Sequence, residues 1–232
     1  MNIYLVNQAK TPLGISNDGL LRIINEYYFE VLDKLWPNGQ ITTVEWASTI
    51  PENEIVALFL DGIGTCGDLA YHDFQPNGLP IIKIDATLGN ITQNVTHELA
   101  EMRADPACNL LVYDANNRIC AYENVDPVQG DTFKLLGFDV SNVVTPSYFW
   151  PNATNCKLDW MDLVKKPFEI RPGGYMSIMT PNGSWTQVDA TNTFGLQENP
   201  ISNRHDIRAS RLAINKLRNQ RMRLNDPIRS SE

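Results

Sequence analysis

The sequence predicts a protein of the α/β (α+β) class, in which short strands alternate with helices. Three observations predict it. Apolar residues recur at helical spacing over 17–35, a second helix is expected at about 91–104 before Pro106, and short apolar or alternating runs bounded by turn residues recur between and after them. The 232 residues, 43% of them hydrophobic, suffice for one main domain that buries a sizeable core.

The first half of the chain predicts strands separated by one helix. Residues 54–62 (EIVALFLDG) form a continuous apolar run that suits a buried strand. The helix at about 17–35 has Asn17 or Asp18 as its expected cap and ends before Pro37. Further strands are expected at 2–7 and 41–48, and two more, joined by a turn, at 71–85.

The second half predicts one helix and then mainly hairpins. The helix at 91–104 ends before Pro106, which prevents continuation. After it we expect a hairpin at 109–126, strand-like segments at 133–150 and a hairpin at 168–189. The resulting domain organisation is a single α/β domain at 1–190 (with an N-terminal strand–helix–strand part at 1–60), a linker at 191–203, and a basic helix or tail at 204–232.

Charge is distributed unevenly along the chain. The net charge is −8, but residues 203–232 hold eight basic and three acidic side chains, net +5, which leaves −13 for the rest. The acidic remainder of the chain disfavours nonspecific nucleic-acid binding. Nucleic-acid contact is therefore expected only at the basic C-terminal tail. No run of about 18 apolar residues exists, so we expect no membrane contact.

The C-terminal segment predicts an amphipathic helix with apolar residues near one side and basic residues over much of the rest. Such a helix can dock on a second copy or another protein while its charges meet an acidic surface or nucleic acid. The alternative is that it packs on its own domain. The residues expected to contact a partner are Arg208, Arg211, Lys216, Arg218, Arg221 and Arg223.

The segment His97-Glu98-Leu99-Ala100-Glu101 is the main candidate for chemistry. Positions i and i+4 lie on one face of a helix, so His97 and Glu101 can converge on one ion, as the two histidines of HExxH do. Glu98 is offset by about 100° and is placed to act as a general base. The alternative is an ordinary surface ion pair between His97 and Glu101.

More acidic residues stand near this segment in the sequence. Asp105 lies two turns beyond His97 and can contribute if the helix end bends before Pro106. Glu123 and Asp126 belong to the following hairpin, which can return against the helix face and supply a third ligand. His72, followed by Asp73, is either a residue that lines the cleft or orients substrate, or one half of a turn-stabilising His–Asp pair.

Several segments together resemble a group of zincin-like proteins of unassigned activity, found in bacteria and in tailed bacteriophages. The matching segments cover roughly 68–190 in the order of that group. They are Tyr71-His72-Asp73, Gly78-Leu79-Pro80, THELAEMRADP (96–106), YENVDPVQGDTF (122–133), VSNVVTPSYFWP (140–151) and PGGYMSIM (172–179). The resemblance implies a zincin-like mixed sheet flanked by an active-site helix, with an N-terminal strand–helix extension and the basic C-terminal helix added.

The resemblance also implies a divalent-metal site. It carries His97, Glu98 and Glu101 over as the metal-helix positions, with Asp105 closing the motif and Glu123 and Asp126 in the acidic hairpin. We expect His97, Glu101 and Glu123 as ligands and zinc as the ion, although a carboxylate-rich site also accepts Mn²⁺ or Ca²⁺. One departure from the group is Val125, which stands where its members tend to carry a cysteine.

Two functions follow as hypotheses. The first is a metal-dependent, peptidase-like hydrolase in which Glu98 is the general base, with the possibility that its activity has been lost. The second is a bacteriophage virion or assembly protein that uses the zincin-like body as a scaffold and the C-terminal helix to contact itself, other phage structural proteins or nucleic acid. The expected location is the host cytoplasm or the virion.

Overall fold

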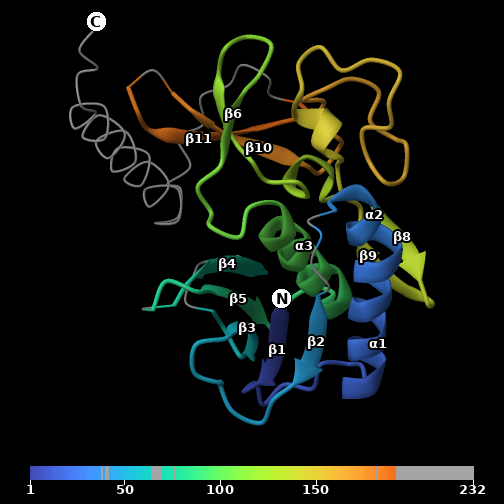
Figure 1. Ribbon diagram of the computed structural model, residues 1–232, viewed down its shortest axis with the longest axis vertical. Coiled ribbons are helices and arrows are strands. Elements are labelled where there is room, and N and C mark those ends of the chain that lie inside the picture. Colours follow the sequence, from blue (N-terminus) through green and yellow to red (C-terminus); the bar gives the residue numbers. More distant parts are fainter. Residues whose placement is uncertain (38, 40–41, 64–68, 76, 181, 192–232) are drawn as a thin grey trace, which may run out of the picture.

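A five-stranded mixed sheet forms the N-terminal half of the fold. The computed structural model describes residues 1–37, 39, 42–63, 69–75, 77–180 and 182–191 (Figure 1). The strand order is β2-β1-β3-β5-β4, in which the first four are parallel neighbours and β4 pairs antiparallel with β5 at one edge. The strands are β1 (Asn2–Asn7), β2 (Thr43–Trp46), β3 (Ile55–Leu60), β4 (Ala70–Phe74) and β5 (Pro80–Asp85).

The first helical segment runs without a break but changes its hydrogen bonding. It comprises α1 (Asn17–Tyr27), a π-helical stretch η1 (Tyr28–Leu32) and α2 (Asp33–Leu35). The expected cap was wrong: Ser16 precedes the first turn, and its side chain accepts a hydrogen bond from the Gly19 amide. The cap therefore lies one residue before Asn17 and two residues before Asp18.

The central helix α3 (Ile91–Ala104) lies between the five-stranded sheet and the C-terminal half of the fold (Figure 1). Asn90 caps it, because the Asn90 side chain accepts hydrogen bonds from the amides of Thr92 and Gln93. The helix packs against β4 and β5 and against a later strand, β9. Most of its residues are buried, which suits a helix covered on several sides.

The C-terminal half contains a four-stranded antiparallel sheet and a separate hairpin. The sheet order is β11-β10-β7-β6, from β6 (Leu111–Tyr113), β7 (Ile119–Ala121), β10 (Tyr175–Met179) and β11 (Trp185–Asp189). The hairpin β8 (Thr132–Leu135) and β9 (Phe138–Ser141) packs against α1 and α3. Two 3₁₀ turns, η2 (Asp126–Val128) and η3 (Pro146–Phe149), connect these strands.

One hydrophobic cluster joins the two halves. It includes Ile3 and Ile82 from the first sheet, Leu99 from α3, Val140 from β9 and Met176 from β10. Buried hydrogen bonds cross the same junction, since the Tyr27 hydroxyl donates to the Ser141 carbonyl at 2.8 Å. Because this cluster buries apolar side chains from both halves, it holds α3 in place between them. The polar residues of α3 are held in place with it.

The basic C-terminal helix that the sequence predicts, residues 204–224, lies outside the described residues, and so do its six proposed partner-contacting residues. Among the helices that the structure describes, none is long and apolar enough to span a membrane.

Candidate metal centre

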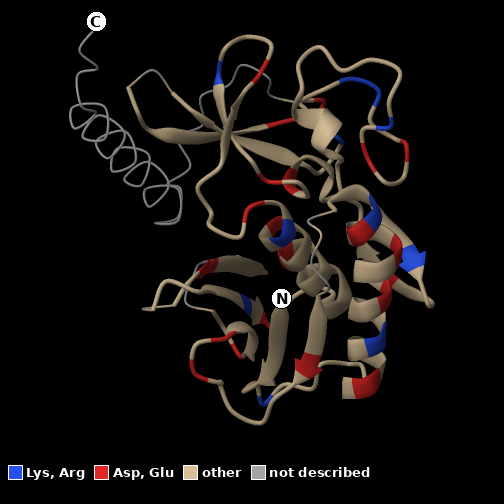
Figure 2. Ribbon diagram, viewed as in Figure 1, with Lys and Arg blue, Asp and Glu red and all other residues tan. Residues whose placement is uncertain are grey.

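The polar residues of α3 are buried inside the fold. Glu98 is 3% exposed and Glu101 is fully buried, while the side chain of His97 is 15% exposed. The alternative of a surface ion pair is therefore wrong for His97 and Glu101. Figure 2 shows acidic positions on α3 and in the chain that faces it. Buried charges of one sign are costly unless something of opposite charge pairs with them.

The first group of ligand-type side chains consists of His97, Glu101 and Asp126. His97 Nε2 lies 3.1 Å from Glu101 Oε1 and 3.3 Å from Asp126 Oδ1. The helix supplies the first two residues at the expected i, i+4 spacing, and η2 supplies the third. All three ligand atoms lie within 4.8 Å of one another, so the group has the size and composition of a metal site.

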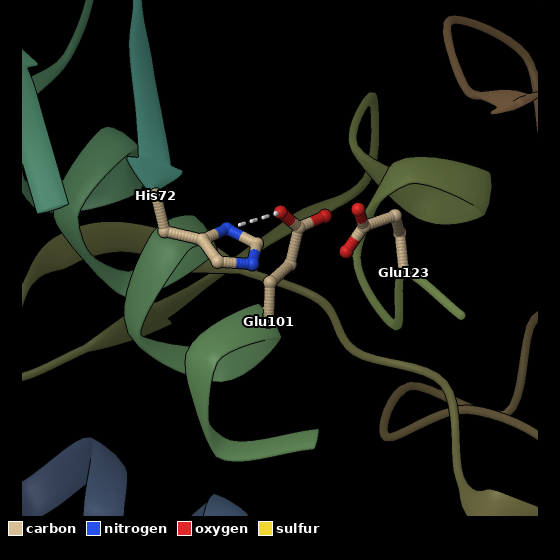
Figure 3. A group of neighbouring side chains, drawn as sticks. All are labelled: His72, Glu101 and Glu123. Carbon is tan, nitrogen blue, oxygen red and sulfur yellow. Dashed lines mark ion pairs between the residues drawn. The ribbon is translucent and has the colours of Figure 1, made fainter. Parts of the chain in front are cut away.

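The second group consists of His72, Glu101 and Glu123, whose ligand atoms also lie within 4.8 Å of one another. His72 comes from the edge strand β4, and Glu123 from the segment between β7 and η2. Figure 3 shows the Glu101 carboxylate between the His72 imidazole and the Glu123 carboxylate. His72 Nδ1 lies 3.4 Å from Glu101 Oε2 and 3.1 Å from Glu98 Oε2. All three members of this group are buried.

The electrostatics of the two groups are coupled through Glu101. Burial opposes the charged form of His97, but Glu101 and Asp126 outweigh it and hold its pKa well above the usual value. Burial likewise opposes ionisation of Glu101, but His97 and His72 outweigh it and hold its pKa well below the usual value. Burial and the nearby Glu101 charge raise the pKa of Asp126 to about 7. The carboxylates of the two groups therefore outnumber the histidines that could neutralise their charge.

Several buried polar atoms in the centre are not satisfied by the protein. His72 Nε2 and Asp126 Oδ2 are buried and have no hydrogen-bond partner. The carboxamide of Asn124, which is fully buried next to Glu123 in the chain, has no hydrogen-bond partner on either atom. Buried polar atoms of this kind are rare because each costs on the order of 1–3 kcal/mol. An imidazole nitrogen and carboxylate oxygens are suitable donors for a divalent ion, so the residues present fit a metal.

The remaining predicted residues have other surroundings. The Asp105 carboxylate accepts hydrogen bonds from the amides of Asn109 and Leu110, so it holds the chain that leaves α3. Asp73 follows His72 in β4 and faces the opposite side of the strand, because successive strand residues alternate. His72 pairs with Glu98 and Glu101, which makes a His72–Asp73 turn pair the wrong interpretation.

The three ligands expected from the sequence are divided between the two groups. Glu101 belongs to both, His97 belongs to the group with Asp126, and Glu123 belongs to the group with His72. Sequence reasoning placed His72 only at the rim of the site. The antiparallel pairing of β4 with β5 was expected from the turn within 71–85, but the sequence pattern did not show that the edge strand β4 packs against α3.

A thiol also lies near the centre. Cys108 is buried, and its sulfur lies 4.0 Å from the His72 carbonyl oxygen. Val125, at the position where the resembled group tends to carry a cysteine, is fully buried in the apolar core. The segment after α3 therefore places a thiol beside His72. Cys108 itself belongs to neither group of ligand-type side chains.

Comparison of the chain with family models, with curated proteins and with solved structures gives no match.

Proposed function

We propose that the protein is a metal-dependent hydrolase of peptidase type with a zincin-like core. The observation that carries this proposal is the convergence of His97 Nε2 with carboxylate oxygens of Glu101 and Asp126, at 3.1 and 3.3 Å, in a largely buried setting. Asp126 thus replaces Glu123 as the third ligand of this ion. We propose zinc as the ion, and the carboxylate-rich donor set also accepts Mn²⁺ or Ca²⁺.

The zincin-like assignment is supported by the position of α3. The helix packs against β4 and β5, at the edge of a mixed sheet where one antiparallel strand borders parallel ones. The resemblance in residues 68–190 implies a mixed sheet flanked by an active-site helix, and the contact of α3 with β4 and β5 agrees with that implication. His97 is the most exposed member of its group, with 15% of its side chain accessible, and we propose that substrate reaches the centre from this residue.

A divalent ion held by these residues supplies Lewis-acid chemistry and lowers the pKa of water near it. Glu98 belongs to the same cluster, because its Oε2 lies 3.1 Å from His72 Nδ1. In amide hydrolysis, the oxygen of a water molecule bonds to the carbonyl carbon while Glu98 accepts a proton from that water. The carbon–nitrogen bond then breaks, and Glu98 returns the proton to the leaving amine.

The test uses the full chain, purified without chelator and assayed on a panel of unstructured peptides. We expect hydrolysis that a chelator abolishes and that added Zn²⁺ or Mn²⁺ restores. Asp126→Asn removes one ligand with little change in volume and should abolish it too. Asp73→Asn, on the opposite face of β4, is the matched control and should keep it. Peptide hydrolysis that survives complete metal removal, or none with any divalent metal, would contradict the proposal.

A further inference from the structure

We infer that the centre holds two divalent ions, with the Glu101 carboxylate bridging them. One ion has His97 and Asp126 as its other ligands, and the second has His72 and Glu123. This inference rests on the proposed function, because it adds a second ion to the site proposed there. Two-metal centres of this kind, with ions roughly 3.5–4 Å apart, occur in hydrolases that activate water between them.

The geometry of Glu101 is the first argument. Its two oxygens face different partners, since Oε1 lies 3.1 Å from His97 Nε2 and Oε2 lies 3.4 Å from His72 Nδ1. A carboxylate that chelates a single ion directs both oxygens to the same point. Here each oxygen belongs to its own set of a histidine and a second carboxylate, and Glu101 is the member that the two sets share.

The charge of the centre is the second argument. Glu98, Glu101, Glu123 and Asp126 are all 3% exposed or less. As metal ligands the two imidazoles are neutral and the four acids are ionised, so the ligand set carries four negative charges. One divalent ion leaves a net charge of −2 in a buried cluster, whereas two divalent ions neutralise it. Because unbalanced buried charge is strongly unfavourable, the composition of the cluster favours two ions.

The His72 imidazole is the third argument. His72 is fully buried on β4, and its Nε2 has no hydrogen-bond partner. Its Nδ1 is hydrogen-bonded to Glu98 Oε2 at 3.1 Å. An imidazole with one nitrogen hydrogen-bonded to a carboxylate and the other left for a metal is the usual arrangement of a histidine ligand. A histidine that only filled the core would have both nitrogens satisfied.

Manganese is the probe for the test, because two bridged Mn²⁺ ions are exchange-coupled and differ from isolated Mn²⁺ in electron paramagnetic resonance. The full chain is stripped with chelator, titrated with Mn²⁺, and analysed for bound metal. We expect two ions per chain and a coupled spectrum. Glu123→Gln and Asp126→Asn, which change charge with little change in volume, should each lower the content to one ion and abolish the coupling, while Asp73→Asn should keep both.

The outcomes separate this inference from the function on which it rests. One ion per chain with an uncoupled spectrum overturns the second ion and leaves the single-ion hydrolase standing. No bound ion overturns both. Two ions without coupling overturn the bridge, because they would occupy separate sites. Circular dichroism of each variant verifies folding, and Glu123→Asp provides a second variant that keeps the charge if Glu123→Gln does not fold.

Discussion

Asp126 Oδ1 lies 3.3 Å from His97 Nε2, although the two residues belong to different halves of the fold. The contact joins η2 to α3, and η2 also contacts the strand β10. Three elements therefore fix one imidazole–carboxylate contact. Ligands on packed elements of this kind suit a metal site, which requires its ligands to be held in place by the surrounding structure.

Glu98→Gln tests the proton-accepting role of Glu98. The amide has nearly the same shape but accepts no proton, so we expect kcat to fall by about 10²- to 10⁴-fold. Metal content should stay the same if Glu98 acts on the proton alone. Parallel assays of peptide hydrolysis and bound metal measure both. An unchanged rate would contradict the role, and loss of metal with the rate would make Glu98 a positioning residue for His72.

Much of the fold could be predicted from local pattern. Strands at 54–62 and 71–85 and the helix at 91–104 agree with β3, β4, β5 and α3, because a continuous apolar run, turn residues and the proline after the helix mark these elements in the sequence. The convergence of His97 with Glu101 followed from i, i+4 spacing in the same way.

The rest depended on contacts between distant segments. Spacing along the chain could not assign Asp126 to His97 and Glu123 to His72, because the two acids stand three residues apart and reach α3 from one short segment. Nor could it reveal the π-helical turn at 28–32, since Tyr27, Tyr28, Val31 and Leu32 satisfy a helical apolar pattern with either hydrogen-bonding scheme.

Metal binding should stabilise the folded protein. A ligand that binds only the native state at a hundredfold excess over its Kd contributes about 2.7 kcal/mol. For a chain of this size each kcal/mol raises Tm by roughly 2–4 °C. Differential scanning calorimetry of the stripped and the Zn²⁺-loaded protein measures the shift, which should be reversed by chelator. The Glu101→Gln variant should show little or none of it, and an equal shift in that variant would contradict the assignment of Glu101.

Gly174 should support the position of Asp126. A Cβ at this glycine would lie 2.2 Å from the Pro127 carbonyl oxygen and 2.9 Å from that of Asp126. Gly174→Ala therefore has to displace η2, and we expect a loss of about 1–3 kcal/mol from overpacking together with weaker metal binding. Chemical denaturation and metal titration measure the two effects.

Gly14→Ala is the control for this substitution. Gly14 has φ +71° and open space where a Cβ would lie, so alanine there costs roughly 1–2 kcal/mol of backbone strain and leaves the centre unchanged. If Gly174→Ala bound metal as tightly as Gly14→Ala does, the packing of Gly174 against η2 would not determine the position of Asp126.

Arg103 should stabilise α3 without affecting the centre. It is buried two residues after Glu101, on the far side of the helix, and its guanidinium donates to the Trp36 carbonyl and to Asp33 at 2.9 and 2.7 Å. Lysine cannot donate to both partners from one planar group as the guanidinium does. We expect urea denaturation of Arg103→Lys to show a free energy of unfolding that is lower by about 1.5–3 kcal/mol. Metal stoichiometry should be unchanged, and a fall in metal content would contradict this separation of roles.

Elemental analysis of the native full-length chain, side by side with a His97→Ala/Glu101→Ala double variant, tests the central claim most directly. We expect the native protein to retain a divalent metal, zinc foremost, in whole-number proportion to the chain after extensive dialysis, and the double variant to retain none. A native protein that carries no metal even after incubation with Zn²⁺ or Mn²⁺, or a double variant that binds as much as the native chain, would contradict it.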